Sequence, residues 1–185
     1  MAWIQVVQEE QAQGRLREFY DKVVEYRGKV ANIFKVHSLN PDAMKAHLDL
    51  YLTIMYGKSG LSRAQREMIA VVVSAVNECE YCIVHHSAAL SRYVKDKSFV
   101  KQLSIDHTKA PLGHKDRAML EYAVKLTKKL TDVEEEDVQS LRSAGFADEE
   151  ILSITLVVSY FNFVNRIVEG LGVKLEQEGG VGYKY

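Results

Sequence analysis

Hydrophobic side chains recur along most of this chain at intervals of three and four residues, which is the spacing of amphipathic helices. In the first such segment, residues 8–26, Leu16, Phe19, Tyr20 and Val23 fall on one face. Similar apolar stripes run through residues 41–56, 62–76, 115–130 and 149–169. The pattern therefore predicts an all-α fold built from long helices.

Few residues interrupt these stripes. Pro41 and Pro111, the only prolines, lie outside the interiors of the long periodic segments, which favours long helices over many short strands. Gly28 is expected to end the first helix, and Asn40 to cap the next one, with Pro41 as its first residue. Residues 31–40 indicate a short helix or turn ahead of that cap.

The segment 62–76 combines a capping signal with an unusually apolar body. Ser62 and Gln65 are spaced as a capping box, and hydrophobic residues then surround the helix on nearly all sides. Its valine run also fits a buried strand, but the cap, the length and the charged first turn favour a helix. We expect this helix at the centre of the core, with oligomerisation completing its burial, and another helix from about residue 79 or 81 to 91.

Further helix-end signals lie in the second half of the chain. Residues 95–113 are mixed, and only a short turn of helix is expected within them. Thr131 and Glu134 have capping-box spacing for a helix that ends at Gly145, and Asp148 is expected to cap the last long helix.

Composition narrows the class of protein. The 185 residues (21.0 kDa, 47% hydrophobic) are expected to form one domain, residues 1–185, with a substantial core. The net charge of −1 disfavours a nucleic-acid partner. No apolar run approaches the roughly 20 residues of a membrane span, and no signal peptide is visible, so we expect a cytoplasmic protein without a membrane partner.

The glycine-rich tail, residues 177–185, should be loosely held, with Tyr183 and Tyr185 exposed.

The sequence shows weak internal similarity when it is aligned with itself at a shift of 85 residues. Four identities then align, namely Val72, Val73, Ser74 and Asn77 with Val157, Val158, Ser159 and Asn162. The match is either a degenerate internal repeat or a chance similarity of common residues. In a repeat, the second copy has kept the helix packing and lost the polar groups, because Cys79, Cys82 and His86 align with apolar residues.

The candidate chemistry is concentrated in residues 77–86, which hold both cysteines and two of the six histidines. Cys79 and Cys82 are spaced as C-x-x-C, which suits a dithiol that cycles with a disulfide and also suits half of a zinc site. In a reducing cytosol such a pair is more often catalytic or metal-binding than structural. A thioredoxin-like fold is disfavoured because no βαβ pattern flanks the pair.

Helix geometry relates these residues to one another. On a helix, Cys79, Cys82 and His86 point within about 60° of one another. A thiol in the first helical turn is close to unpaired backbone N–H groups, which lower its pKa and favour the thiolate. His86, one turn beyond Cys82, can exchange a proton with that sulfur. His85 points about 100° away and is expected to be a packing or partly exposed histidine.

Glu67 joins this group only if the chain reverses at residues 77–78. It would then lie level with His86 on the other helix of an antiparallel pair, since each is roughly 13–15 Å from the reversal. A carboxylate facing a histidine holds its tautomer and raises its proton affinity. The alternative is that Glu67 is an acid of the first helical turn, or pairs with Arg63 or Arg66.

At these residues the chain resembles the alkylhydroperoxidase D family, within the carboxymuconolactone decarboxylase-like superfamily. That family's core pattern is a glutamate, eleven residues, C-x-x-C, and a histidine four past the second cysteine. Glu67, Cys79, Cys82 and His86 meet every spacing, and the match covers roughly residues 60–92. The remaining length and the stretch from His37 to Pro41 resemble the peroxidase-related branch.

The resemblance implies an all-helical, antioxidant, thiol-dependent peroxidase that forms a homo-oligomer, such as a trimer, hexamer or dimer. It implies that Cys82 attacks a hydroperoxide substrate, that Cys79 resolves the sulfenate as a disulfide, and that His86 and Glu67 relay protons. We accordingly expect Cys82 to be the cysteine of low pKa, and a thiol or dithiol to be the reductant. The best-known members carry a histidine immediately before the second cysteine, where this chain has Tyr81.

Two alternative functions fit the sequence less well than a peroxidase. A decarboxylase-like or lactone-processing relative is disfavoured by the presence of the cysteine pair. A non-enzymatic zinc module would use Cys79, Cys82 and either His85 or His86, but a closed tetrahedral site usually draws its ligands from two separated segments. We therefore expect neither a metal nor a cofactor.

Overall fold

The fold is known from a computed structural model, which describes residues 2–177, 179 and 183. These residues form α-helices and short 3-10 helices and contain no strand, which confirms the all-α prediction. The α-helices are α1 (Gly14–Arg27), α2 (Asn32–Lys35), α3 (Pro41–Tyr56), α4 (Arg63–Val76), α5 (Glu80–Leu90), α6 (Lys97–Asp106), α7 (His114–Lys128), α8 (Glu135–Ser143) and α9 (Asp148–Leu171). The 3-10 helices are η1 (Glu9–Gln11), η2 (His107–Lys109) and η3 (Leu130–Asp132).

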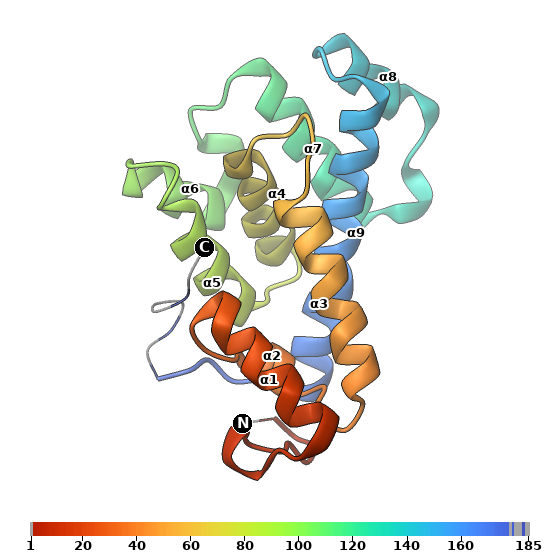
Figure 1. Ribbon diagram of the computed structural model, residues 1–185. Helices are drawn as coiled ribbons and strands as arrows, with labels where there is room; N and C mark the ends of the chain where they lie inside the picture. The colour runs from red at the N-terminus through yellow and green to blue at the C-terminus, as the bar shows by residue number, and fades with distance from the viewer. Residues whose placement is uncertain (1, 178, 180–182, 184–185) are drawn as a thin grey trace.

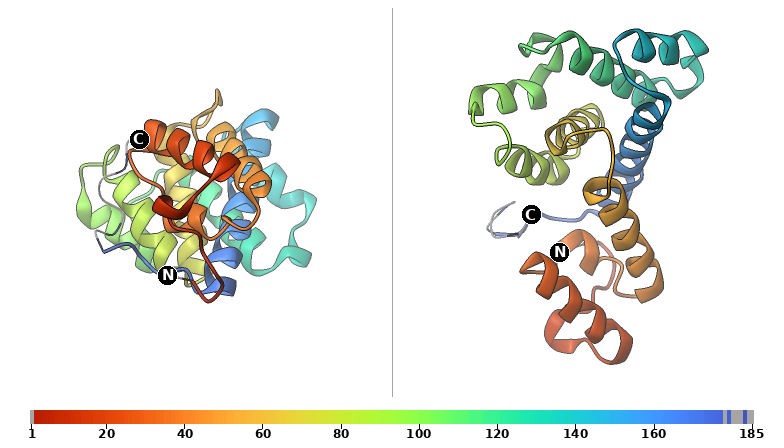
Figure 2. Two further views of the ribbon diagram at one scale, coloured as in Figure 1. Left: turned by 60° about the horizontal axis from the view of Figure 1, so that its bottom comes forward. Right: turned by 45° about the horizontal axis from the view of Figure 1, so that its top comes forward.

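Helix α4 is the centre of the fold. It packs against α5, α7 and α9 and also touches α3 and α6, so that it lies between the α5–α6 pair and α9 (Figure 2). Nine consecutive residues, Arg66–Ser74, are buried. The Ser62 hydroxyl accepts a hydrogen bond from the Gln65 amide, and the Gln65 side-chain oxygen accepts one from the Ser62 amide, which confirms the predicted capping box. The two ends of α4, residues 63–65 and 75–76, are half-buried in the single chain, and the expectation that oligomerisation completes the burial stays a prediction.

The chain reverses between α4 and α5, and this hairpin builds the site. Asn77 ends α4, Glu78 takes a left-handed φ of 57°, and the Cys79 amide donates to the Ser74 carbonyl at 2.9 Å. The Asn77 side-chain amide donates to Asn162 at 3.1 Å and to Asn165 at 2.9 Å, which ties the turn to α9. The internal repeat remains a prediction, although Asn77 and Asn162, which the 85-residue shift aligns, are in contact.

Other helix ends agree with the sequence in part. Gly28 follows α1 with a φ of 84°, and the Asn40 side chain caps α3 through the amide of Ala43. The segment 95–113 holds ten helical residues in α6, more than the short turn that was expected.

Two predicted caps were wrong. Glu134, not Thr131, caps α8, and its amide donates a hydrogen bond to the Asp137 carboxylate. Asp148 lies inside the first turn of α9, where Glu150 accepts a hydrogen bond from the amide of the preceding Ala147. In both helices a carboxylate further into the first turn satisfies the free amide, because these turns are rich in acidic residues.

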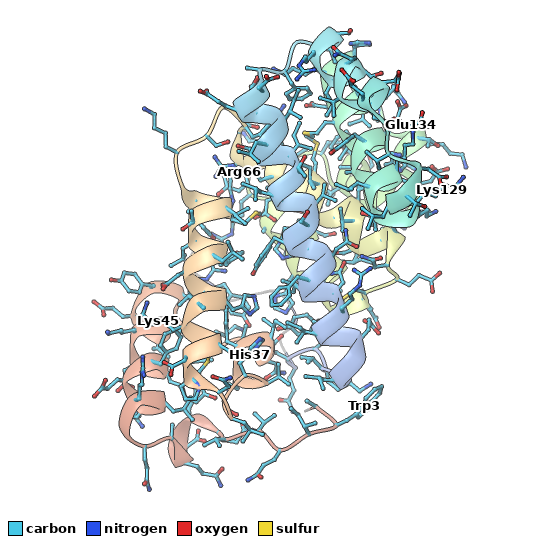
Figure 3. The ribbon with its side chains drawn as sticks, turned by 90° about the vertical axis from the view of Figure 1, so that its right-hand side faces the viewer. Trp3, His37, Lys45, Arg66, Lys129 and Glu134 are labelled. Carbon is cyan, nitrogen blue, oxygen red and sulfur yellow. The ribbon has the colours of Figure 1, made fainter. Side chains whose placement is uncertain are left out.

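Helix α9 forms the long edge of the molecule and lies beside α3 (Figures 1 and 3). Among the described residues it is the one helix long and apolar enough, by length and composition, to cross a membrane, which corrects the statement that no run approaches that length. Its contacts with α3, α4, α7 and α8 explain the apolar composition, because they are the contacts of a core helix. Leu152, Leu156 and Phe163 nevertheless remain 43% to 60% exposed.

After α9 the chain turns back across the molecule, and Glu176 in this segment contacts His85 of α5 (Figure 1). The expectation of an exposed Tyr183 was wrong, because this residue is 4% exposed and its ring contacts that of His85 at 5.3 Å. Most of the tail that was expected to be loosely held, including Tyr185, lies outside the described residues.

Candidate functional site

The two cysteines lie at the start of α5. Cys79 is the N-cap residue and Cys82 follows in the first turn, and both are at most 2% exposed. Their sulfurs are 2.7 Å apart and both thiols are free. Cys82 lines a cavity and Cys79 is not among the residues that line it. A molecule in this cavity therefore meets Cys82 first, with the second sulfur directly behind it.

Glu67 and His86 meet across the α4–α5 hairpin, as the reversal predicted. His86 Nδ1 lies 2.7 Å from Glu67 Oε2, and the Glu67 side chain is fully buried. The alternative prediction also holds in part, because Arg63 donates to Glu67 Oε1 at 2.6 Å. Arg66 instead donates to the carbonyls of Leu61 and Ile54. Glu67 thus bridges a guanidinium and an imidazole.

This bridge fixes one tautomer of His86. With Nδ1 donating to Glu67, Nε2 is left as the nitrogen that can accept a proton. The Phe161 ring packs edge-on against the imidazole at 4.5 Å and limits its rotation. His86 and Cys82 are one turn apart on α5 and line the same cavity. The imidazole is therefore held where it can take a proton from the cavity side.

The electrostatics of Cys82 differ from the expectation. Its hydrogen bond with Cys79, then burial and the charge of a Cys79 thiolate, raise the pKa of the Cys82 thiol above its ordinary value, and a hydrogen bond from Asn165 offsets only part of this. The prediction of a low pKa took account of the position of Cys82 at the helix start but not of the neighbouring Cys79 sulfur. Deprotonation of Cys82 consequently needs a base rather than a pre-formed thiolate.

A second carboxylate, which the sequence did not reveal, lies on the other side of α5. Glu176 Oε2 is 2.8 Å from His85 Nε2, and Glu176 Oε1 accepts from the Tyr81 hydroxyl at 2.9 Å and the Asn32 amide at 2.7 Å. Burial raises the pKa of Glu176, but the hydrogen bonds from His85 and Asn32 outweigh it and lower the pKa to about 2. His85 is thus one half of a second carboxylate–imidazole pair. Glu176 directly precedes the glycine-rich tail, in a stretch without a periodic pattern, so its sequence position did not indicate a role in the site.

Tyr81 is fully engaged in this second cluster. It donates to Glu176 and accepts from the Ile33 amide at 3.3 Å, and its ring contacts that of His85 at a tilt of 37°, with the centroids 4.4 Å apart. Burial, followed by the charge of Glu176, raises the pKa of Tyr81 well above 10. Tyr81 therefore keeps its proton and orients Glu176.

The cavity next to Cys82 has a volume of about 60 Å³ and is mainly aromatic. Burial lowers the pKa of His47 to about 3, so this histidine is neutral there, and it lies 2.8 Å from the Tyr160 hydroxyl. The lining residues are Arg27, Ala31, Ile33, Phe34, His47, Tyr51, Tyr81, Cys82, His85, His86, Tyr160, Phe161, Val164 and Tyr183. Such a surface suits a small apolar molecule with a polar reacting end.

The residues proposed for a zinc module do not converge. Within residues 2–177, 179 and 183, no group of three or more histidine, cysteine or acidic side chains could hold a metal ion. His85 and His86 each bind a different carboxylate, Glu176 from the segment after α9 and Glu67 from α4.

The chain is similar in sequence and fold to known proteins. The model of the Carboxymuconolactone decarboxylase family matches residues 41–97. A structure of an alkylhydroperoxidase AhpD core, an uncharacterized peroxidase-related protein from Ralstonia eutropha JMP134, is similar at 30% identity and a TM-score of 0.88, over 97% of this chain and 95% of that one. An uncharacterized peroxidase-related protein from Silicibacter sp. TM1040 is similar at 32% identity and a TM-score of 0.84, over 98% and 93%.

A more distant structure shares only the fold. The debrominase Bmp8 is 20% identical, with a TM-score of 0.77 over 93% of this chain and 91% of that one. The chain matches no curated protein sequence.

Proposed function

Because the chain belongs to the alkylhydroperoxidase D-like proteins of the carboxymuconolactone decarboxylase superfamily, we propose that it is a thiol-dependent peroxidase. It reduces organic hydroperoxides through Cys79 and Cys82. The observation that carries the proposal is the arrangement at the cavity. Cys82 lines it, the Cys79 sulfur lies 2.7 Å away from Cys82, and the Glu67–His86 pair is one helical turn further on.

In the first half-reaction, His86 Nε2 takes the proton of the Cys82 thiol. The thiolate attacks the terminal peroxide oxygen, so that an S–O bond forms and the O–O bond breaks. The leaving oxygen takes a proton and departs as an alcohol. Glu67 holds His86 in the accepting tautomer and stabilises the imidazolium, while the hydrogen bond from Arg63 holds Glu67 in place.

In the second half-reaction, Cys79 resolves the sulfenate. The Cys79 sulfur attacks Cys82, an S–S bond forms, the S–O bond breaks, and the oxygen leaves as water with one proton from each group. An external dithiol of the dihydrolipoamide or thioredoxin class then reduces the disulfide and is itself oxidised. Because Cys79 lies behind Cys82 and away from the cavity, the roles are assigned in this order.

Assembly and location are part of the same proposal. The exposed side chains Leu152, Leu156 and Phe163 share one face of α9, and we propose that this face joins copies of the chain into a homo-oligomer. A free buried dithiol of this kind functions in a reducing compartment, so we propose a cytoplasmic location.

The experiment is a peroxide-consumption assay with tert-butyl hydroperoxide and cumene hydroperoxide as substrates. Dihydrolipoamide and thioredoxin with its reductase are offered as electron donors. Wild-type protein should turn over with at least one dithiol donor, and Cys82→Ser should show no consumption above background. Wild-type protein that consumes neither hydroperoxide with either donor, and that does not react with one equivalent of either in the absence of donor, contradicts the proposal.

A further inference from the structure

Two separate carboxylate–imidazole pairs border the same cavity. Glu67 reaches His86 from α4, and Glu176 reaches His85 from the segment after α9. Both histidines line the cavity together with Cys82. The peroxidase chemistry described above uses only the first pair, although the second is equally well built. Its carboxylate accepts three hydrogen bonds and its imidazole is 9% exposed.

Cleavage of the O–O bond of an alkyl hydroperoxide by a thiol requires two proton transfers. The attacking thiol must lose a proton, and the leaving alkoxide, a strong base, must gain one as the bond breaks. A single imidazole performs both only in sequence, after it has taken the thiol proton. Two imidazoles, one accepting and one donating, allow both transfers in one step.

The two histidines differ in a way that assigns the roles. His86 lies one turn beyond Cys82 on α5. His85 lines the cavity and pairs through Nε2 with the Glu176 carboxylate, which holds the ring in one orientation. Because Nε2 is held by Glu176, Nδ1 is the nitrogen left to donate to a substrate. Tyr81 does not compete for this role, since its hydroxyl proton is already donated to Glu176.

We propose that His85, positioned by Glu176, is the general acid that protonates the leaving oxygen of the hydroperoxide. The inference rests on the proposed peroxidase function and adds a second catalytic histidine to it. The Cys82 sulfur is oxidised to a sulfenic acid, and the peroxide is reduced to an alcohol. One proton passes from the thiol to His86, and another passes from His85 to the alkoxide, so charge and atoms balance.

The leaving group provides the test. tert-Butyl hydroperoxide releases an alkoxide that needs a proton, whereas peracetic acid releases acetate, which needs none at neutral pH. Reduced protein is mixed with an excess of each peroxide and quenched with an alkylating agent. Mass spectrometry then gives the rate of Cys82 oxidation. The variants are His85→Gln, Glu176→Gln and His86→Gln, with His114→Gln as the matched control, because His114 is exposed at the start of α7.

The expected result is selective. His85→Gln should be slowed about 10²-fold or more with tert-butyl hydroperoxide and by no more than a few-fold with peracetic acid. Glu176→Gln should show the same selectivity at roughly 10-fold, the scale for loss of a group that orients a catalytic residue. His86→Gln should be slowed with both peroxides, and His114→Gln with neither. Glu176→Gln provides a second, milder variant if His85→Gln does not fold, as judged by circular dichroism.

Equal slowing with both peroxides, or no slowing, in folded His85→Gln and Glu176→Gln would overturn the assignment of His85 and leave the peroxidase function intact. A wild-type protein that is oxidised by neither peroxide would instead refute the proposed function, and the inference with it. The two failures are therefore distinguishable.

Discussion

Replacement of Glu176 by glutamine should destabilise the folded protein in a pH-dependent way. Folding lowers the pKa of this carboxyl group from 4.5 to about 2, since the hydrogen bonds from His85 and Asn32 outweigh its burial. At 1.36 kcal/mol per pH unit, the difference corresponds to an upper bound of about 3 kcal/mol. Part of the site is open to solvent, and screening reduces the expected contribution to about 1–2 kcal/mol.

The sign follows from linkage. A carboxyl group whose pKa is lower in the folded state contributes its full stabilisation above the unfolded value of 4.5. This contribution is lost as the pH falls through the folded value of about 2. Wild type should therefore exceed Glu176→Gln by about 1–2 kcal/mol at pH 6, and the gap should narrow between pH 4.5 and the lowest pH at which both proteins fold.

The assay is urea unfolding followed by circular dichroism at several pH values between 3 and 7. Glu18→Gln, which changes an exposed glutamate of α1, is the matched control and should shift stability by less than about 0.5 kcal/mol at every pH. A gap between wild type and Glu176→Gln below 0.5 kcal/mol at pH 6 would refute the reasoning. So would a gap that stays constant down to pH 3.

Three further predictions concern the core of the site and its support. Glu67→Gln removes a buried charge from between a guanidinium and an imidazole. It should lower the free energy of unfolding by about 3 kcal/mol in urea at pH 7, and a loss under about 1 kcal/mol would contradict this. Cys79→Ala removes the main cause of the raised Cys82 pKa, so thiolate absorbance should titrate Cys82 at lower pH than in wild type, and an unchanged or higher midpoint would contradict this. Gly172 has a φ of 59° and lies against Trp3, so Gly172→Ala should lower stability by about 1–2 kcal/mol in the same urea assay, and an unchanged midpoint would contradict the strain.

The parts of the site that depend on local geometry could be predicted from the sequence. Cys82 and His86 are one turn apart on one helix, and a single reversal brings Glu67 level with His86, so helix dimensions alone place the three. The capping box at Ser62 and the end of α1 at Gly28 could also be predicted, because they depend on residues only a few positions apart.

The remainder depends on contacts between distant segments. Glu176 reaches His85 from 91 residues further along the chain, out of a glycine-rich stretch without periodicity. His85 was expected to be a packing residue for the same reason, since its partner could not be seen. The raised pKa of Cys82 depends on a 2.7 Å approach of the Cys79 sulfur, which helix dipole reasoning leaves out.

The most direct test of the central claim is the mass of the reduced protein before and after one equivalent of tert-butyl hydroperoxide, followed by alkylation and peptide mapping. The account predicts that the peptide carrying Cys79 and Cys82 loses two hydrogens and takes up no alkylating agent, and that a dithiol restores both thiols. Two free cysteines that are alkylated as fully after peroxide as before would contradict it.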